Sequence, residues 1–236
     1  MVLICCVAFT HAVVAQKNLL NQVQQAVNGS SGSGIGLSND DIVKGLKSAL
    51  NVGTNNSTSL ASKLDGYYKN PNIKIPFPKE AKAMEQQLRS LGMNKQVDKF
   101  IMTLNRAAED AAKSAAPIFV DAVTKMTITD GLNILKGSND AATNFLKNGS
   151  SAALIEKFKP IIQASLDKVE VTKYWKPLVK TYNQIPMVKK QNPNLNEYVT
   201  QKAIEGLFKL IADEELKIRK DPTARVNDIL KKVFGK

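Results

Sequence analysis

The sequence predicts an all-α fold, a single domain of about eight to ten helices with one irregular proline-rich loop. Apolar residues recur at three- and four-residue steps along most of the chain, as on the buried face of amphipathic helices. Capping residues at the expected helix starts, and Gly or Pro at the expected ends, divide this pattern into segments. The only alternating, strand-like pattern is the short stretch Ile73–Ile75.

The first fifteen residues resemble a cleaved export signal. The stretch Val2–Val14 is almost entirely apolar and is followed by Ala15, with small residues at the positions that a signal peptidase reads. It is shorter than the ~20 residues that a transmembrane helix needs. Lipidation at Cys5 is the alternative, and it would give a lipid-anchored protein. We therefore expect an exported protein, periplasmic or envelope-associated, with no transmembrane segment in the mature chain.

The mature chain predicted in this way contains neither histidine nor cysteine, because His11, Cys5 and Cys6 all lie in the signal. It lacks the most common general base, the thiol nucleophile and the main ligands of zinc, copper and haem. We therefore expect no metal site and no cofactor. A cysteine-free chain also suits an oxidising compartment, since it cannot form wrong disulfides.

The net charge of +12 is compatible with nucleic acid, anionic lipid or an acidic polymer as a partner. The lysines are spread along the chain, and no block of five or more basic residues occurs. This distribution favours a solvated lysine-rich surface over a dedicated polyanion site, and we expect no specific nucleic-acid partner.

The helical domain is expected to cover residues 37–236, after a short amphipathic stretch and a Gly/Ser-rich linker over residues 16–36. Ser38 can cap its first helix, and Asp41, three residues later, approximates a capping box. Two separate amphipathic segments are expected next, Ile42–Val52 and Leu60–Tyr68.

The most irregular part of the chain follows, where prolines at positions 71, 76 and 78 exclude helix and favour an extended path. Pro78 can begin a helix that ends before Gly92. The clearest helical pattern runs from Val97 to Ile118, and we expect Pro117 to kink or restart it.

Thr127 and Asp130 form a second capping-box pattern, which opens a short helix closed by Gly137. The remaining helices are expected over Ser138–Leu146, Ala152–Val169, Val171–Tyr182, Leu195–Ile218 and Ala224–Phe234.

Four short motifs are distinctive: Asn105–Glu109, Met126–Asp130, Ile134–Gly137 and Asp140–Thr143. Through them the chain closely resembles the bacterial family known as domain of unknown function 4197. The resemblance covers almost all of residues 37–236 and extends to Asp65–Gly66, Ile73–Pro78, Tyr198–Thr200, Gly206–Phe208, Glu214–Glu215, Ile218–Arg219 and Pro222–Arg225. It implies an exported or membrane-anchored bacterial protein and brings no activity with it.

Asn105 and Glu109 lie four residues apart and share a helix face beside small alanines, with Arg106 within reach of Glu109. Glu214 interrupts an apolar stripe, so we expect it to be buried with Arg106 or Arg219 as its partner.

The candidate polar network is therefore Asn105, Arg106, Glu109, Asp130, Glu214 and Arg219. One interpretation, which we favour, is an ion-pair network that fixes helix register. The other is a carboxylate-dependent hydrolase with Glu109 and Glu214 as the acid–base pair.

The proline-rich loop carries a second candidate set, Tyr67, Tyr68, Ile73, Ile75 and Phe77. These side chains either line an apolar groove or belong to a segment that crosses the core. We favour the second arrangement.

Together these features favour an exported, non-enzymatic helical protein of the bacterial envelope, with a binding or structural role. A lipid or another envelope component is the expected partner, bound as an apolar or anionic lipid-like ligand. The alternatives are the carboxylate-dependent hydrolase and a non-specific polyanion binder.

Overall fold

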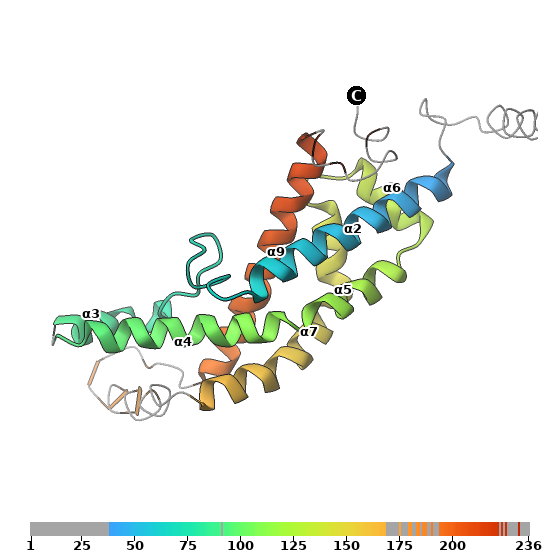
Figure 1. Ribbon diagram of the computed structural model, residues 1–236. Helices are drawn as coiled ribbons and strands as arrows, with labels where there is room; N and C mark the ends of the chain where they lie inside the picture. The colour runs from blue at the N-terminus through green and yellow to red at the C-terminus, as the bar shows by residue number, and fades with distance from the viewer. Residues whose placement is uncertain are drawn as a thin grey trace, which may run out of the picture.

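The computed structural model describes residues 38–90, 92–168 and 194–221, together with isolated positions between 175 and 190 and at 223, 225 and 231. These residues form an all-α fold with seven α-helices, one 3₁₀ turn and no strand (Figure 1). The predicted signal over residues 1–15 and the linker over residues 16–36 lie outside the described residues.

Four long helices make up most of the described fold: α2 (Asn39–Ser62), α4 (Asn94–Ala112), α7 (Ala141–Asp167) and α9 (Leu195–Lys220). Helices α4 and α9 each contact the other three. Figure 1 shows α3 lying alongside α4, and α9 crossing behind α2. In chain order the elements are α2 (Asn39–Ser62), the 3₁₀ turn η1 (Lys79–Ala81), α3 (Lys82–Ser90), α4 (Asn94–Ala112), α5 (Ala115–Thr124), α6 (Ile128–Lys136), α7 (Ala141–Asp167) and α9 (Leu195–Lys220).

Seven α-helices are fewer than the eight to ten expected, and merging of predicted segments explains part of the difference. Helix α2 is continuous across Ile42–Val52 and into the second predicted segment. The hydroxyls of Thr54 and Thr58 donate to carbonyls four residues back, at 2.8 and 2.9 Å, so these buried polar groups are satisfied without a break in the helix.

Helix α7 likewise joins two predicted segments and contains Pro160. A proline inside a helix costs ~3 kcal/mol. Full burial of Phe158 and Ile162, together with Leu154, stabilises the packed helix by about 1.5–3 kcal/mol for each side chain. Packing on one face therefore outweighs the proline, which lies at an exposed position.

The helix starts predicted at Ser38 and Thr127 and the restart at Pro117 are confirmed. Ser138 does not cap α7, whose N-cap residue is Asp140. The Asp41 amide donates to Ser38 Oγ at 3.1 Å, and the Asp130 amide donates to Thr127 Oγ1 at 3.2 Å. Pro117 is the third residue of α5, and the first turn of a helix tolerates proline because its N–H groups have no intrahelical partners.

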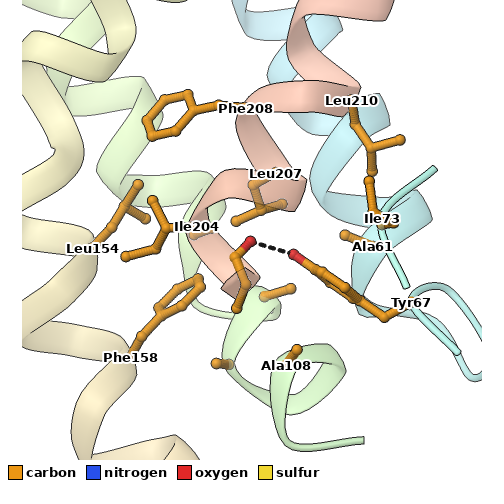
Figure 2. Packing of buried hydrophobic residues seen from close by; sticks show 14 of the residues in the cluster. Ala61, Tyr67, Ile73, Ala108, Leu154, Phe158, Ile204, Leu207, Phe208 and Leu210 are labelled. Atoms are coloured by element: carbon orange, nitrogen blue, oxygen red, sulfur yellow. Dashed lines mark hydrogen bonds between the residues drawn. The ribbon is translucent and has the colours of Figure 1, made fainter. Parts of the chain in front are cut away.

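Residues 63–78, here called the strap, run between α2 and η1 and pack against both α4 and α9. Figure 2 shows Tyr67 and Ile73 of the strap beside Leu207 of α9 and Ala108 of α4. Helix α4 carries four small residues that are almost fully buried, which lets neighbouring backbones approach closely: Ala107, Ala108, Ala111 and Ala112.

Candidate functional site

Asn105 holds the strap against α4 through its side-chain amide. Asn105 Oδ1 accepts a hydrogen bond from the Ile75 amide, and Nδ2 donates to the Ile75 carbonyl, both at 2.8 Å. Nδ2 also donates to the Ile101 carbonyl of its own helix. The side chain is fully buried, and it satisfies a strap residue that has no strand or helix to pair with.

Glu109 anchors the other end of the strap. Its Oε1 accepts hydrogen bonds from the amides of Tyr67 and Tyr68, both at 3.1 Å. Its Oε2 pairs with Arg106 Nη1 at 2.6 Å, and its side chain is only 5% exposed. Both oxygens are thus engaged, as expected for a buried carboxylate in a structural role.

Arg106 continues this network to the strap. Its Nη2 lies 2.6 Å from Asp65 Oδ1, and Asp65 also pairs with Lys69 at 2.8 Å. Asp65 has a positive φ of 67°, and hydrogen bonds from Lys69 and Arg106 hold the pKa of its carboxyl below the usual value. These pairs fix the turn in which the chain leaves α2.

Glu214 does not occupy the buried position predicted for it. It pairs with Lys217 on the surface of α9, and its side chain is 25% exposed. Its neighbour Glu215 is the buried carboxylate, with a side chain that is 8% exposed. Helix α9 buries a wide arc of its surface, and near its C-terminal end that arc includes the face toward the start of α7.

Glu215 caps the first turn of α7 from another helix. Its oxygens accept hydrogen bonds from the Ala142 amide at 3.0 Å, the Thr143 amide at 2.9 Å and the Thr143 hydroxyl at 2.8 Å. A carboxylate is stabilised at this position by the free N–H groups and the positive end of the helix dipole. The local N-cap residue, Asp140, makes no such side-chain bond.

Arg219 completes this junction. It donates to Glu215 Oε1 through Nε at 3.0 Å, and through Nη2 at 2.8 Å to both Glu215 Oε1 and the Ile134 carbonyl near the end of α6. The Glu215–Arg219 pair therefore joins the end of α6 to the start of α7. The positive charge of Arg219 lies at the C-terminal end of α6, and the negative charge of Glu215 lies at the N-terminal end of α7, as the helix dipoles favour.

The predicted polar residues thus divide between four places, one of which is the surface position of Glu214 on α9. Asn105, Arg106 and Glu109 hold the strap, whereas Arg219 belongs to the junction of α6 and α7. Asp130 closes the capping box of α6 and contacts neither group, with its Oδ2 accepting from the Thr127 amide at 2.9 Å. Glu109 and Glu214, the alternative acid–base pair, have different partners: Glu109 pairs with Arg106, and Glu214 pairs with Lys217.

Most of the predicted groove set is buried rather than lining an open groove. Tyr67, Ile73, Ile75 and Phe77 are buried in the core, and the Tyr67 hydroxyl donates to the Ala203 carbonyl at 2.6 Å (Figure 2). Of the five predicted residues, only Tyr68 is partly exposed, with the Lys74 ammonium 4.5 Å from its ring centre. The strap therefore crosses the core.

The outer side of the strap does form a groove with α9. Ile73 and Ile75 of the predicted set belong to its lining, whereas Tyr67, Tyr68 and Phe77 do not, and the sequence did not predict the wall on α9. This lysine groove has a volume of about 290 Å³. Its wall on the strap is Asn72–Pro76 with Lys79, and its wall on α9 is Tyr198, Lys202, Glu205, Gly206 and Lys209. The α9 residues recur at helical spacing, which could have shown a shared face but not what lies opposite.

Gly206 allows the two walls to approach. A Cβ at this position would lie 2.7 Å from Tyr67 Cε1 and 3.2 Å from Ile73 Cβ. The Tyr198 hydroxyl donates to the Pro76 carbonyl at 3.0 Å and closes one end of the contact. The groove is thus held by bonds within the fold.

A second, mainly apolar cavity of about 40 Å³ lies between α2, α6, α7 and α9, next to Glu215 and Arg219. It has room for little more than one water molecule. In the part of the chain that the structure describes, no group of three or more acidic, His or Cys side chains gathers to hold a metal ion. No helix among those residues is long and apolar enough to cross a membrane.

Comparison with known proteins gives one match. The family described as "Protein of unknown function (DUF4197)" matches residues 36–235, nearly the whole chain. No curated protein and no solved structure matches.

Proposed function

The chain belongs to the family described as "Protein of unknown function (DUF4197)", and we propose that it is a non-enzymatic binding protein of the bacterial envelope whose ligand is anionic and lipid-like. The lysine groove between the strap and α9 is the proposed site. Export rests on the apolar signal-like stretch over residues 1–15.

The charge of the groove carries this proposal. Four lysines line it, Lys74, Lys79, Lys202 and Lys209, against the single carboxylate of Glu205. A concave surface with an excess of one charge concentrates ligands of the opposite charge. Pro76 and Tyr198 add apolar surface at the same place, which suits a ligand with both an anionic head and an apolar part.

The buried carboxylates support a binding role over hydrolysis. Glu109 and Glu215 each accept hydrogen bonds from main-chain amides and pair with an arginine, so their oxygens hold the fold together. A general base needs an oxygen within reach of substrate. Glu214, at the surface of α9, is paired with Lys217 of the next helical turn.

Vesicle co-sedimentation tests this proposal. The purified protein is expected to bind vesicles of neutral lipid containing an anionic lipid, to release them as salt rises, and to ignore purely neutral vesicles. The double substitution Lys74→Glu and Lys79→Glu is expected to abolish binding. Absence of binding to any anionic vesicle at low salt would contradict the proposal.

The matched control is the double substitution Lys147→Glu and Lys157→Glu, which makes the same charge change at exposed positions of α7 outside the groove. This variant is expected to keep most of the binding. Equal loss in both variants would instead indicate a non-specific polyanion binder that responds to net charge alone.

A further inference from the structure

The four lysines of the groove are not equivalent, because some of them already have partners. Lys202 pairs with Glu205 at 2.5 Å, and Lys209 pairs with Asp213 at 2.7 Å. Lys74 lies over the ring of Tyr68. Lys79, the first residue of η1, has no ion-pair partner among the residues that the structure describes, so Lys74 and Lys79 offer the least compensated charges.

The charge that remains sets the charge of the ligand. Four lysines against Glu205 leave an excess of three positive charges in the lining, and the Asp213 carboxylate outside the lining offsets one more. A ligand with two negative charges would balance the remainder. A phosphomonoester carries about −1.5 to −2 at pH 7 and has three acceptor oxygens, whereas a phosphodiester or a carboxylate carries only one charge.

The size of the groove points to a headgroup. Small-molecule sites typically measure ~300–1,000 Å³. At about 290 Å³, the groove lies at the lower end of this range and suits a phosphoryl head with a few attached atoms. Its walls are joined by the Tyr198–Pro76 and Tyr67–Ala203 hydrogen bonds, so little ordering is needed when a ligand binds.

We infer that the lysine groove is a site for a phosphomonoester dianion, held between Lys74 of the strap, Lys79 at the start of η1 and Lys202 of α9. In this inference Glu205 is an internal counter-ion that the ligand displaces from Lys202. This inference rests on the proposed function and narrows its ligand to one charge class. It assigns opposite effects to neighbouring residues of the same groove: the lysines favour binding, and Glu205 opposes it.

The test compares two vesicle types at equal surface charge, one containing phosphatidate and one containing phosphatidylglycerol. The headgroup of phosphatidate is a phosphomonoester, whereas the headgroup of phosphatidylglycerol is linked through a phosphodiester. The inference predicts tighter binding to phosphatidate vesicles. Equal binding to both would overturn the inference while the proposed function stood, and absence of binding to both would overturn the lipid-like ligand of the proposed function.

Soluble glycerol 3-phosphate distinguishes the two sources of the phosphomonoester. If it competes with phosphatidate vesicles, or binds alone in calorimetry, the head is recognised by itself. If only vesicles bind, with the phosphatidate preference retained, the lipid surface is part of the ligand. Both results support the dianion site. If neither phosphatidate vesicles nor glycerol 3-phosphate bind the protein, the dianion site is contradicted.

Single substitutions test whether each residue favours or opposes phosphatidate binding. Lys79→Gln is expected to weaken phosphatidate binding at least about fivefold, and Glu205→Gln to tighten it by about threefold or more. Lys147→Gln, at an exposed position of α7, is the control and is expected to bind like the parent. Weaker binding by Glu205→Gln, in a protein with an unchanged melting temperature, would contradict the counter-ion role.

Discussion

The Tyr67 hydroxyl donates a 2.6 Å hydrogen bond to the carbonyl of Ala203, which lies 136 positions further along the chain. The bond is fully buried and ties the strap to α9 directly under the lysine groove. Movement of this ring would therefore shift one wall of the groove relative to the other.

Substitution of Gly206 by Ala is expected to lower the free energy of unfolding by about 1–2 kcal/mol. The added Cβ would lie 2.7 Å from a Tyr67 ring that is fully buried and held by its hydroxyl, so the strap would have to move. Urea unfolding measures this effect. Gly149→Ala is the control, because its Cβ would only reach ordinary contact with Ala122 at 3.6 Å, and it is expected to stabilise the helix by about 0.5–1 kcal/mol.

Adjacent residues of α9 are expected to respond very differently to the same substitution. Glu215→Ala should cost about 3–5 kcal/mol, because it leaves Arg219 and the first amides of α7 without their buried acceptor. Glu214→Ala should cost less than about 1 kcal/mol, since it removes a surface pair with Lys217. Melting temperatures of the two variants test this, and a larger loss from Glu214→Ala would refute the assignment of the buried carboxylate.

Glu109→Ala is expected to destabilise the protein by about 3–5 kcal/mol, because Arg106 and two strap amides lose a shared buried acceptor. Glu109→Gln should cost less, since its amide oxygen can still accept from Tyr67 and Tyr68. Limited proteolysis is a second readout, and cleavage in residues 63–78 is expected to accelerate in the Ala variant. A strap that remains protected in a destabilised Ala variant would show that Glu109 does not hold it.

The capping box of α6 gives the protein a stability that depends on pH. Hydrogen bonds from the Thr127 side chain and backbone lower the pKa of Asp130 from its usual 3.8. A carboxyl whose pKa is lower in the folded state contributes full stability above the unfolded value and loses it as pH falls through the folded value. The urea midpoint should therefore fall with acidification below about pH 4, and this fall should be smaller in Asp130→Asn.

Local features of this fold could be predicted from the sequence, because they depend on residues close together in the chain. The caps at Ser38 and Thr127 are examples, since each needs only an acceptor and a donor three residues apart. The pairing of Arg106 with Glu109 is of the same kind.

Features that depend on packing between distant segments could not be predicted in the same way. Glu214 and Glu215 both flank the apolar stripe of α9, and only the position of α7 decides which one is buried. The lysine groove joins residues 72–79 to residues 198–209, and no pattern within either segment identifies the other. The burial of the strap could not be predicted either, because its apolar residues are compatible with a core segment as well as with a groove.

The capping of α7 by Glu215 also has a consequence for the order of folding. Seventy-two residues separate Glu215 from Thr143, whose amide it accepts, so the cap cannot form until α9 has docked. During synthesis the first turn of α7 is made long before its cap. Substitutions at Thr143 should therefore increase the unfolding rate more than they decrease the folding rate in kinetic experiments. The start of α7 is thus completed only by α9, the last helix of the described fold.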